Sequence, residues 1–345
     1  MKEAAFYQQL NYDKVQCSLC PHNCTIAAGQ RGVCGVRENQ QGKLYSLVYG
    51  KVISSAIDPI EKKPLFHFLP GSFSYSIATA GCNFRCDFCQ NWQISMMGKG
   101  AKGAEGLGGK GMPGMEQLPY QVVAAALENE CRSISYTYTE PTIYFEFAYD
   151  CAKLAREKGV KNVFVTNGYM NPPVAEQIAP YLDAANIDLK SFREEFYQKV
   201  CGGRLAPVLQ TIKLLKQRKV WIELTTLVIP GLNDTVEELT ELAGFIKNEV
   251  GADTPWHVSA FRPTYKMADR PPTPPESLLR AREIGLKAGL KYVYTGNVLV
   301  PGAEDTYCGQ CRQPLIVRSG FTVKDNQLKS GRCPKCDAAA DGVWA

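Results

Sequence analysis

Three closely spaced cysteines carry the clearest chemical signal in this sequence. Cys82, Cys86 and Cys89 occupy the stretch CNFRCDFC. A [4Fe–4S] cluster normally takes four cysteine ligands, so a trio can hold three irons and leave the fourth open to a ligand that is not part of the protein. A structural zinc site requires four protein ligands and fits a trio less well. We therefore predict that Cys82, Cys86 and Cys89 hold a catalytic iron–sulfur cluster.

A second cysteine pattern lies near the C-terminus. Two C-x2-C pairs, separated by about 20 residues, are formed by Cys308, Cys311, Cys333 and Cys336. This spacing is typical of a zinc ribbon, in which four thiolates surround one metal. Iron bound as in rubredoxin uses the same geometry, so the metal is left open as zinc or iron. The surrounding basic residues have few aromatic neighbours, which favours a structural or docking role over nucleic-acid binding.

A third pattern lies near the N-terminus and has a less standard spacing. It consists of Cys17, Cys20, Cys24 and Cys34. We predict zinc in preference to a second iron–sulfur cluster here, although both accept four thiolates. His22 lies inside this set and could replace one cysteine as a ligand. The remaining cysteines, Cys131, Cys151 and Cys201, have no partners in the sequence and are expected to be buried as small hydrophobic residues.

Composition narrows the compartment and the class of protein. The chain has 345 residues, with 14 Cys but only 3 His, and a formal net charge of +5. The small supply of histidine excludes a His-rich zinc hydrolase centre, and the small charge excess gives no argument for nucleic-acid binding. The N-terminal residues lack the apolar stretch of a secretory signal, and no apolar run is long enough to cross a membrane. We expect a cytoplasmic protein whose cysteines bind metals rather than form disulfides.

Strands and helices alternate through the middle of the chain. Strands are predicted at Ser74–Thr79, Ser133–Tyr138, Asn162–Thr166, Leu182–Leu189, Val220–Ile229, Trp256–Phe261 and Lys291–Thr295. Helices are predicted at Leu118–Cys131, Ile143–Lys158, Leu205–Gln217, Thr235–Val250 and Pro275–Ala288. This order predicts an α/β fold, a partial (β/α)6 TIM-like barrel with its chemistry at the C-terminal ends of the strands.

Two smaller modules are expected to flank the barrel, which we place at residues 73–303. Residues 1–72 would form a Cys-rich metal-binding module with a strand or hairpin at Lys43–Ile53. Residues 304–345 would form the zinc-ribbon or rubredoxin-like module. The glycine-rich segment 98–114 follows the cysteine trio and could be a lid over the site or a tolerated insertion.

The cysteine trio and the barrel pattern together resemble the radical S-adenosylmethionine (SAM) enzymes. The resemblance covers residues 74 to 300. It implies that SAM chelates the open iron through its amino and carboxylate groups. One electron would then cleave SAM into methionine and a 5′-deoxyadenosyl radical, which abstracts hydrogen from a substrate.

Further strand ends resemble the pyruvate formate-lyase activating-enzyme branch of this superfamily. Thr139, Glu140 and Pro141 lie where the branch has a G-G-E-P stretch that holds the SAM amino group; alternatively, Glu140 caps the next helix. Thr166 and Asn167 belong to a T-N-G turn. Asp188 and Lys190 match a pair that contacts the SAM ribose and carboxylate, with a strand-end ion pair as the alternative. His257 and Asn91 are further SAM-contact candidates, although a strand histidine is often a core residue.

A finer resemblance covers most of the chain. The stretches CSLCPHNC, DPIEKKPLFHFLPGS and TAGCNFRCDFCQNW, with the C-terminal cysteines, are similar to the radical SAM member of the AmmeMemoRadiSam system. This implies neighbours of the Memo and AMMECR types and a one-electron reductant such as flavodoxin or ferredoxin. We consider three functions: a radical SAM enzyme with an unidentified substrate, a glycyl-radical-enzyme activase acting on a protein glycine, and a non-catalytic metal-binding adaptor.

Overall fold

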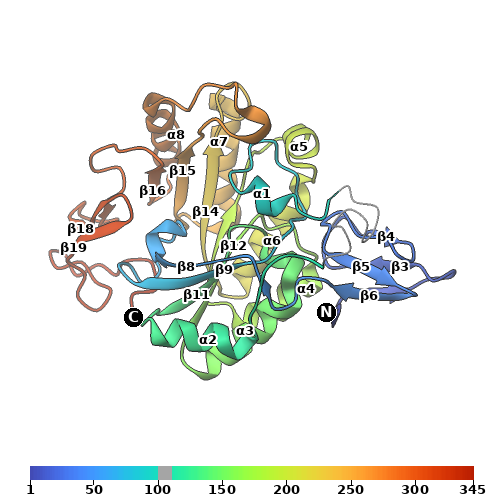
Figure 1. Cartoon of the computed structure of the whole chain (residues 1–345). Coiled ribbons are helices and arrows are strands. Elements are labelled where there is room, and N and C mark those ends of the chain that lie inside the picture. The colour runs from blue at the N-terminus through green and yellow to red at the C-terminus, as the bar shows by residue number, and fades with distance from the viewer. Residues whose placement is uncertain (100–110) are drawn as a thin grey trace.

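An eight-stranded sheet forms the centre of the computed structural model, which describes residues 1–99 and 111–345 (Figure 1). From β9 onward the neighbouring strands run parallel, whereas β8 runs antiparallel to β9 at one edge. In spatial order the strands are β8 (Ser54–Pro59), β9 (Phe73–Ala78), β11 (Ser133–Tyr136), β12 (Lys161–Thr166), β13 (Ala184–Asp188), β14 (Trp221–Val228), β15 (Trp256–Ala260) and β16 (Val293–Gly296). No strand pairing joins β16 to β8 within the described ranges, so the sheet is open.

Helices follow most of the parallel strands, as expected for an α/β fold. The α-helices are α1 (Trp92–Ser95), α2 (Pro119–Glu128), α3 (Phe145–Glu157), α4 (Pro172–Ile178), α5 (Glu194–Phe196), α6 (Leu205–Gln217), α7 (Val236–Phe245) and α8 (Pro275–Ala288). Shorter 3-10 or π-helical turns are η1 (Ile60–Lys62), η3 (Pro141–Tyr144), η4 (Ala179–Tyr181), η5 (Tyr197–Cys201), η6 (Ile246–Val250) and η7 (Tyr265–Met267). The α/β class and the parallel order agree with the sequence prediction, whereas α1, α4 and α5 are additional helices.

The helices bury one apolar face against the sheet. In α3 the buried residues include Phe145, Phe147 and Ala148, and Cys151 lies among them with no exposed surface. The strands are buried along nearly their whole length, because helices and chain segments cover both faces of a parallel sheet. Cys151 and Cys131 are buried without ligand partners, which fits the expectation of small hydrophobic residues.

The segment 60–71, which follows β8 along the chain, packs against the inner face of the sheet. Ile60, Leu65 and Phe68 form one buried cluster with Val163 and Ala184 from the strands β12 and β13. The Asn186 side chain of β13 also donates a hydrogen bond to the Pro64 carbonyl over 2.8 Å. The sequence analysis assigns residues 54–71 to the N-terminal module, yet β8 and this segment are integral to the central sheet.

The remaining parts of the two flanking modules lie at opposite sides of the sheet (Figure 1). The N-terminal part contains β1 (Lys2–Glu3), β2 (Tyr7–Gln9), β3 (Val15–Cys17), β4 (Thr25–Ile26), β5 (Arg37–Gln40) and β6 (Lys43–Ser46), and β7 (Lys51–Val52) pairs with β10 (Met115–Glu116). The C-terminal part contains β17 (Thr306–Tyr307), β18 (Pro314–Ser319) and β19 (Thr322–Asn326). Most of the glycine-rich segment 98–114 lies outside the described residues.

Among the described residues, every helix is too short or too polar to traverse a lipid bilayer.

Candidate functional site

A cavity of about 520 Å³ opens at the C-terminal ends of the parallel strands. All three cysteines of the predicted cluster loop line it, as do six other predicted site residues. These lining residues are Cys82, Cys86, Cys89, Asn91, Thr139, Thr166, Asn167, Asp188 and Lys190. Because the carboxyl ends of parallel strands share one edge of the sheet, residues far apart in sequence meet here.

The cysteine trio lies in the loop after β9. Its sulfurs receive polar hydrogens from neighbouring groups: the Phe84 amide lies 3.3 Å from Cys82 Sγ, and Asn167 Nδ2 lies 3.9 Å from the same sulfur. Burial raises the pKa of Cys82, whereas a hydrogen bond with the Cys201 thiol lowers the pKa of Cys86. Cys201, expected to be only a buried hydrophobic residue, therefore contacts a predicted ligand.

The spacing of these three sulfurs suits a cluster better than a single ion. In the part of the chain that the structure describes, the one group of three or more potential ligand atoms within 4.8 Å of one another is at the C-terminus. Cys82, Cys86 and Cys89 thus line a common cavity, but their sulfur atoms are too far apart to bind one metal ion. A [4Fe–4S] cluster fits this arrangement, because each thiolate binds a different iron.

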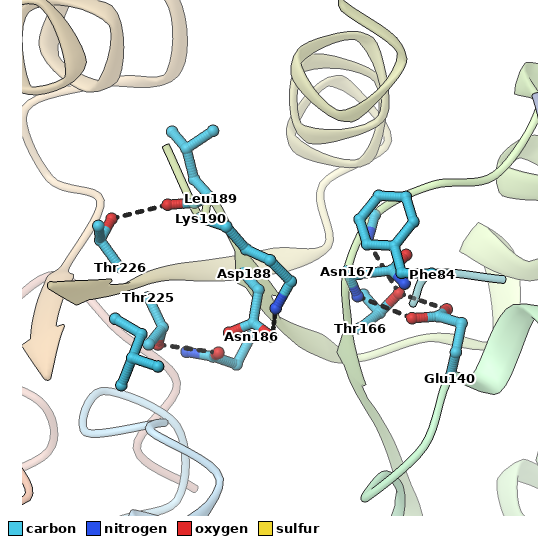
Figure 2. A network of polar contacts seen from close by, with 12 residues as sticks. Phe84, Glu140, Thr166, Asn167, Asn186, Asp188, Leu189, Lys190, Thr225 and Thr226 are labelled. Atoms are coloured by element: carbon cyan, nitrogen blue, oxygen red, sulfur yellow. Dashed lines mark hydrogen bonds and ion pairs between the residues drawn. The ribbon is translucent and has the colours of Figure 1, made fainter. Parts of the chain in front are cut away.

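Glu140 lies beneath the cavity and does not line it. Its carboxylate accepts hydrogen bonds from the Thr142 amide and hydroxyl, from the Thr166 hydroxyl at 2.7 Å and from the Asn167 amide at 2.8 Å. Figure 2 shows this carboxylate directed at the turn after β12. Glu140 is also the N-cap of η3. The family resemblance implies that this carboxylate holds the SAM amino group. In the structure four donors within the protein already occupy it, so Glu140 positions Thr166 and Asn167.

Pro141 begins η3 and is buried beside Glu140, away from the cavity. Thr139 does reach the cavity, and its hydroxyl donates to the Thr79 carbonyl over 2.8 Å. Asn91 donates to the Tyr138 carbonyl over 2.8 Å and lines the same space. Of the Thr139-Glu140-Pro141 stretch, Thr139 is therefore the member placed to meet a ligand.

Asp188 ends β13, Lys190 lies two residues after it, and both line the cavity. Lys190 Nζ lies 2.8 Å from Asp188 Oδ2, and Figure 2 shows the Lys190 side chain directed at Asp188. Burial acts to lower the pKa of Lys190, but Asp188 and the Cys86 thiol raise it overall. The lysine therefore stays charged beside the cysteine trio. The pair is both the ion pair and the cavity-lining group that the sequence analysis weighed as alternatives.

His257 of β15 is placed in the core and does not line the cavity. Its Nε2 lies 2.7 Å from Glu223 Oε2, and both side chains are buried. Glu223 also accepts hydrogen bonds from the amides of Phe66 and His67. The predicted SAM contact of His257 therefore has no geometric support, because the ring is engaged in anchoring the segment 60–71.

Sequence reasoning missed a basic wall on the cavity. Lys62 and Lys63 line it, with Tyr138, Thr225, Ser259 and Phe321. Lys63 Nζ lies 2.5 Å from the buried Asp58 carboxylate, and the Tyr138 hydroxyl contacts the same carboxylate. Burial lowers the pKa of Lys63 to about 8, against the opposing effect of Asp58. The DPIEKKPLF stretch contains both lysines. It predicts that they line the cavity only when segment 60–71 is known to pack against the sheet.

The four C-terminal cysteines form a compact group. Cys308 Sγ lies 3.6 Å from Cys336 Sγ, and Cys311 Sγ lies 3.7 Å from Cys333 Sγ. Ligands that lie 2.3 Å from a tetrahedral zinc are about 3.8 Å apart, so this spacing fits one tetrahedral ion. The predicted four-thiolate metal site is thus geometrically assembled, and the group could hold a metal. Cys17, Cys20, Cys24 and Cys34 also gather around one enclosed cavity at the other side of the molecule.

Comparisons with known proteins agree with the site. The sequence model of the "Radical SAM superfamily" matches residues 76–245, which include the cysteine trio, Asp188 and Lys190. Protein MJ0808 of Methanocaldococcus jannaschii is 46% identical over 345 residues, covering 99% of this chain and 100% of that protein. The pyruvate formate-lyase-activating enzyme of Clostridium pasteurianum is 24% identical over 168 residues, or 49% of this chain and 67% of that protein.

Solved structures resemble the chain only distantly. SuiB of Streptococcus suis bound to S-adenosylmethionine gives a TM-score of 0.48 at 14% identity, covering 69% of this chain and 53% of that chain. A domain of pyruvate-formate lyase-activating enzyme from Bacteroides vulgatus gives 0.42 at 17% identity, covering 48% of this chain and 99% of that chain. The profile match and the full-length relative are the stronger findings: residues 76–245 match the radical SAM superfamily as a domain, and the whole chain belongs to one family with MJ0808.

Proposed function

We propose that this protein is a radical SAM enzyme that acts on an anionic substrate. The observation that carries the proposal is the meeting of Cys82, Cys86 and Cys89 with Asp188 and Lys190 on one cavity at the strand ends. When bound, a [4Fe–4S] cluster with SAM would supply one electron for reductive cleavage of SAM, yielding a 5′-deoxyadenosyl radical that abstracts hydrogen.

The residues of the chain divide the remaining work. Lys190 offers a fixed positive charge to the carboxylate of SAM, and Asp188 accepts hydrogen bonds from ribose hydroxyls. Thr139 and Asn91 border the same space with polar atoms. Glu140 holds the turn at Thr166 and Asn167 in place, so that Asn167 stays beside Cys82.

The basic wall supports the choice of substrate class. Lys62 and Lys63 line the cavity from segment 60–71, whereas Asp188 ends β13 and Lys190 follows it. Among the described residues, the two lysines share a single carboxylate partner, Asp58. Lys62 pairs with its Oδ1 and Lys63 with its Oδ2. The two ammonium groups therefore leave net positive charge for a carboxylate or phosphate on the substrate.

The direct test is formation of 5′-deoxyadenosine by the anaerobically reconstituted full-length protein with SAM and dithionite. We expect Cys86→Ala to abolish the product and Cys131→Ala, a buried cysteine away from the cavity, to keep it. Absence of the product from the unaltered protein would overturn the enzymatic proposal and favour the adaptor function. With candidate substrates carrying deuterium, label should appear in 5′-deoxyadenosine, and Lys63→Met should raise KM at least about tenfold with a smaller effect on kcat.

A glycyl-radical-enzyme activase is the second candidate. The observation favouring it is the likeness to activating enzymes of pyruvate formate-lyase, which spans about half of this chain. An activase would generate a stable protein radical in a partner, detectable by electron paramagnetic resonance (EPR), whereas an enzyme for small anionic molecules would not. The partners we propose are a flavodoxin- or ferredoxin-type reductant and, from the finer family resemblance, Memo-like and AMMECR-type proteins.

For the C-terminal group we propose a structural zinc ion. The 3.6 and 3.7 Å sulfur pairs support a single tetrahedral ion, and rubredoxin-like iron would fit the same spacing. Metal analysis of Cys308→Ala distinguishes the two, since either one zinc or one iron per chain should be lost.

A further inference from the structure

The four N-terminal cysteines surround a small space in an apolar setting. Their side chains line one enclosed cavity of about 10 Å³, whose walls include Leu19, Ile26 and Ile143. The cysteines come from the end of β3, the loop before β4 and the turn before β5. Four convergent thiols with room between them form a site that the catalytic cavity does not explain.

The spacing of these sulfurs argues against a single zinc ion. Four sulfurs at 2.3 Å from one metal leave no space among them, yet this cavity has about the size needed for one water molecule. Across the described ranges, the C-terminal cysteines form a ligand group within 4.8 Å, whereas no three N-terminal cysteines do. In this respect the N-terminal set resembles the catalytic trio.

Arg37 supplies an independent observation. This buried side chain lines the same cavity, and its Nη1 pairs with Glu146 at 2.9 Å while Nη2 donates to the Ala5 carbonyl. Its Nε, however, has no hydrogen-bond partner among the described residues. A buried donor without an acceptor usually marks a missing ion or water. Sulfur atoms of an iron–sulfur cluster, which accept such hydrogen bonds, would satisfy it.

We propose that Cys17, Cys20, Cys24 and Cys34 hold a second iron–sulfur cluster, through which electrons reach the catalytic cluster. Backbone groups of His22, Val33 and Val36 hydrogen-bond to Cys20, Cys24 and Cys34 respectively. Such bonds to ligand sulfurs, with the Arg37 charge, stabilise the added electron of a reduced cluster. The cluster assignment stands on this site alone, whereas the electron-transfer role rests on the proposed function.

The location of the N-terminal loop supports the electron-transfer role. His22, which lies between Cys20 and Cys24, places Nε2 2.8 Å from the carbonyl of Asn83, the residue after Cys82. Its ring also packs edge-on against Tyr169, with centroids 5.1 Å apart. A single side chain therefore joins the two cysteine loops.

Further hydrogen bonds hold the N-terminal cysteine loop against the central domain. The Asn171 amide donates to the Leu19 carbonyl, its side chain donates to Ser18, and Arg204 donates to Pro21. In the proposed sequence, a reduced flavodoxin- or ferredoxin-type protein loses one electron to the N-terminal cluster. That electron then reduces the catalytic cluster, which returns to its oxidised state when SAM is cleaved.

The first test counts metals in the reconstituted full-length protein. Cys24→Ser should lose about two to four irons with matching sulfide, while Cys131→Ala keeps all of them. Retention of the SAM-perturbed EPR signal of the catalytic cluster would show that Cys24→Ser is folded. Loss of one zinc, or unchanged iron, would overturn the proposal. If Cys24→Ser does not fold, Arg37→Lys should instead keep the iron but shift the reduction potential of one EPR signal; unshifted potentials would count against the site.

The second test compares two reductants for SAM cleavage. With reduced flavodoxin, Cys24→Ser should form 5′-deoxyadenosine at least about tenfold more slowly, whereas with dithionite, which can reach the catalytic cluster directly, its rate should fall less than about twofold. Equal losses with both reductants would overturn the electron-transfer role. Failure of the unaltered protein to form product with either reductant would refute the proposed function, while the iron count would still decide the cluster.

Discussion

The two terminal cysteine sets contain the same number of thiols but differ in the spacing of the sulfur atoms and in the pKa of the thiols. At the C-terminus the sulfurs already lie in pairs 3.6 and 3.7 Å apart. Burial acts to raise the pKa of Cys308, but hydrogen bonds from the Cys311 and Gln310 amides and from Cys336 lower it to about 7. At the N-terminus the sulfurs surround a cavity, and burial raises the pKa of Cys34 to about 11. Ligand spacing and solvation, rather than ligand number, therefore distinguish the two sites.

The two modules that carry these sets also attach to the central domain at different places. His22 joins the N-terminal loop to the catalytic cysteine loop. His67 joins the C-terminal tail to β16 of the central sheet, with Nδ1 2.6 Å from the Asp341 carbonyl and Nε2 2.6 Å from the Tyr294 hydroxyl. Burial lowers the pKa of His67 to about 4, so the neutral ring donates at Nδ1 and accepts at Nε2. One end of the chain contacts the catalytic cysteine loop, and the other contacts segment 60–71, which contributes to the cavity wall.

The largest effect that would sharpen this comparison is expected at Arg37. Arg37→Met leaves Glu146 buried without its cation, which should destabilise the protein by about 3–5 kcal/mol. The same change at the C-terminus, Arg332→Met, breaks only the exposed pair with Asp337 and should leave the denaturant midpoint unchanged. Arg37→Met/Glu146→Leu should recover part of the loss. Equal midpoints for Arg37→Met and Arg332→Met would show that the two modules are anchored alike.

A smaller effect is expected for the two joining histidines. His67→Ala removes two buried hydrogen bonds and should lower the unfolding free energy by about 1–3 kcal/mol. It should also increase proteolysis of the C-terminal tail while leaving the EPR spectrum of the catalytic cluster unaltered. His22→Ala should change that spectrum with less effect on stability. Spectral change in His67→Ala but not in His22→Ala would reverse the assignment.

The smallest effect concerns the pH dependence of metal binding. Because only the thiolate binds metal, protons compete at Cys308 when the pH falls below about 7. The C-terminal metal affinity should then weaken by about a further tenfold, or 1.4 kcal/mol, per pH unit, and this contribution should disappear above pH 7. Chelator competition between about pH 8 and pH 5.5 measures it. Release of the N-terminal iron along the same curve would mean that the two sites are equivalent.

Sequence patterns predicted the parts of the molecule that depend on local order. The parallel strands were recognisable as short apolar runs between helical segments, and the three cysteine sets were recognisable by spacing. The cap of α7 shows the limit of such rules. Asp234 directly precedes the predicted helix and is a residue type that commonly caps one, but its carboxylate accepts from the Gly231 amide, and Thr235 caps the helix instead.

Contacts between distant segments could not be predicted in the same way. Glu140 and His257 lie at positions where the family resemblance implies SAM contacts, yet each is engaged by buried partners. Those partners come from a neighbouring strand or the turn after it, and Glu223 in turn holds segment 60–71, whose position no periodicity reveals. The sequence did not predict the basic wall of Lys62 and Lys63 for the same reason. The two side chains line the cavity only because segment 60–71 packs against the sheet.

The placement of segment 60–71 has a consequence for how the chain folds. The Phe66 and His67 amides bond to Glu223, more than 150 positions away, and the Val343 amide bonds to the His67 carbonyl. Contacts of such high sequence separation form slowly, because long loops must close first. We expect the part of the cavity wall formed by segment 60–71 to be the last region to assemble, after synthesis of the C-terminal tail. Substrate binding should therefore be lost early when the chain is truncated at its C-terminal end.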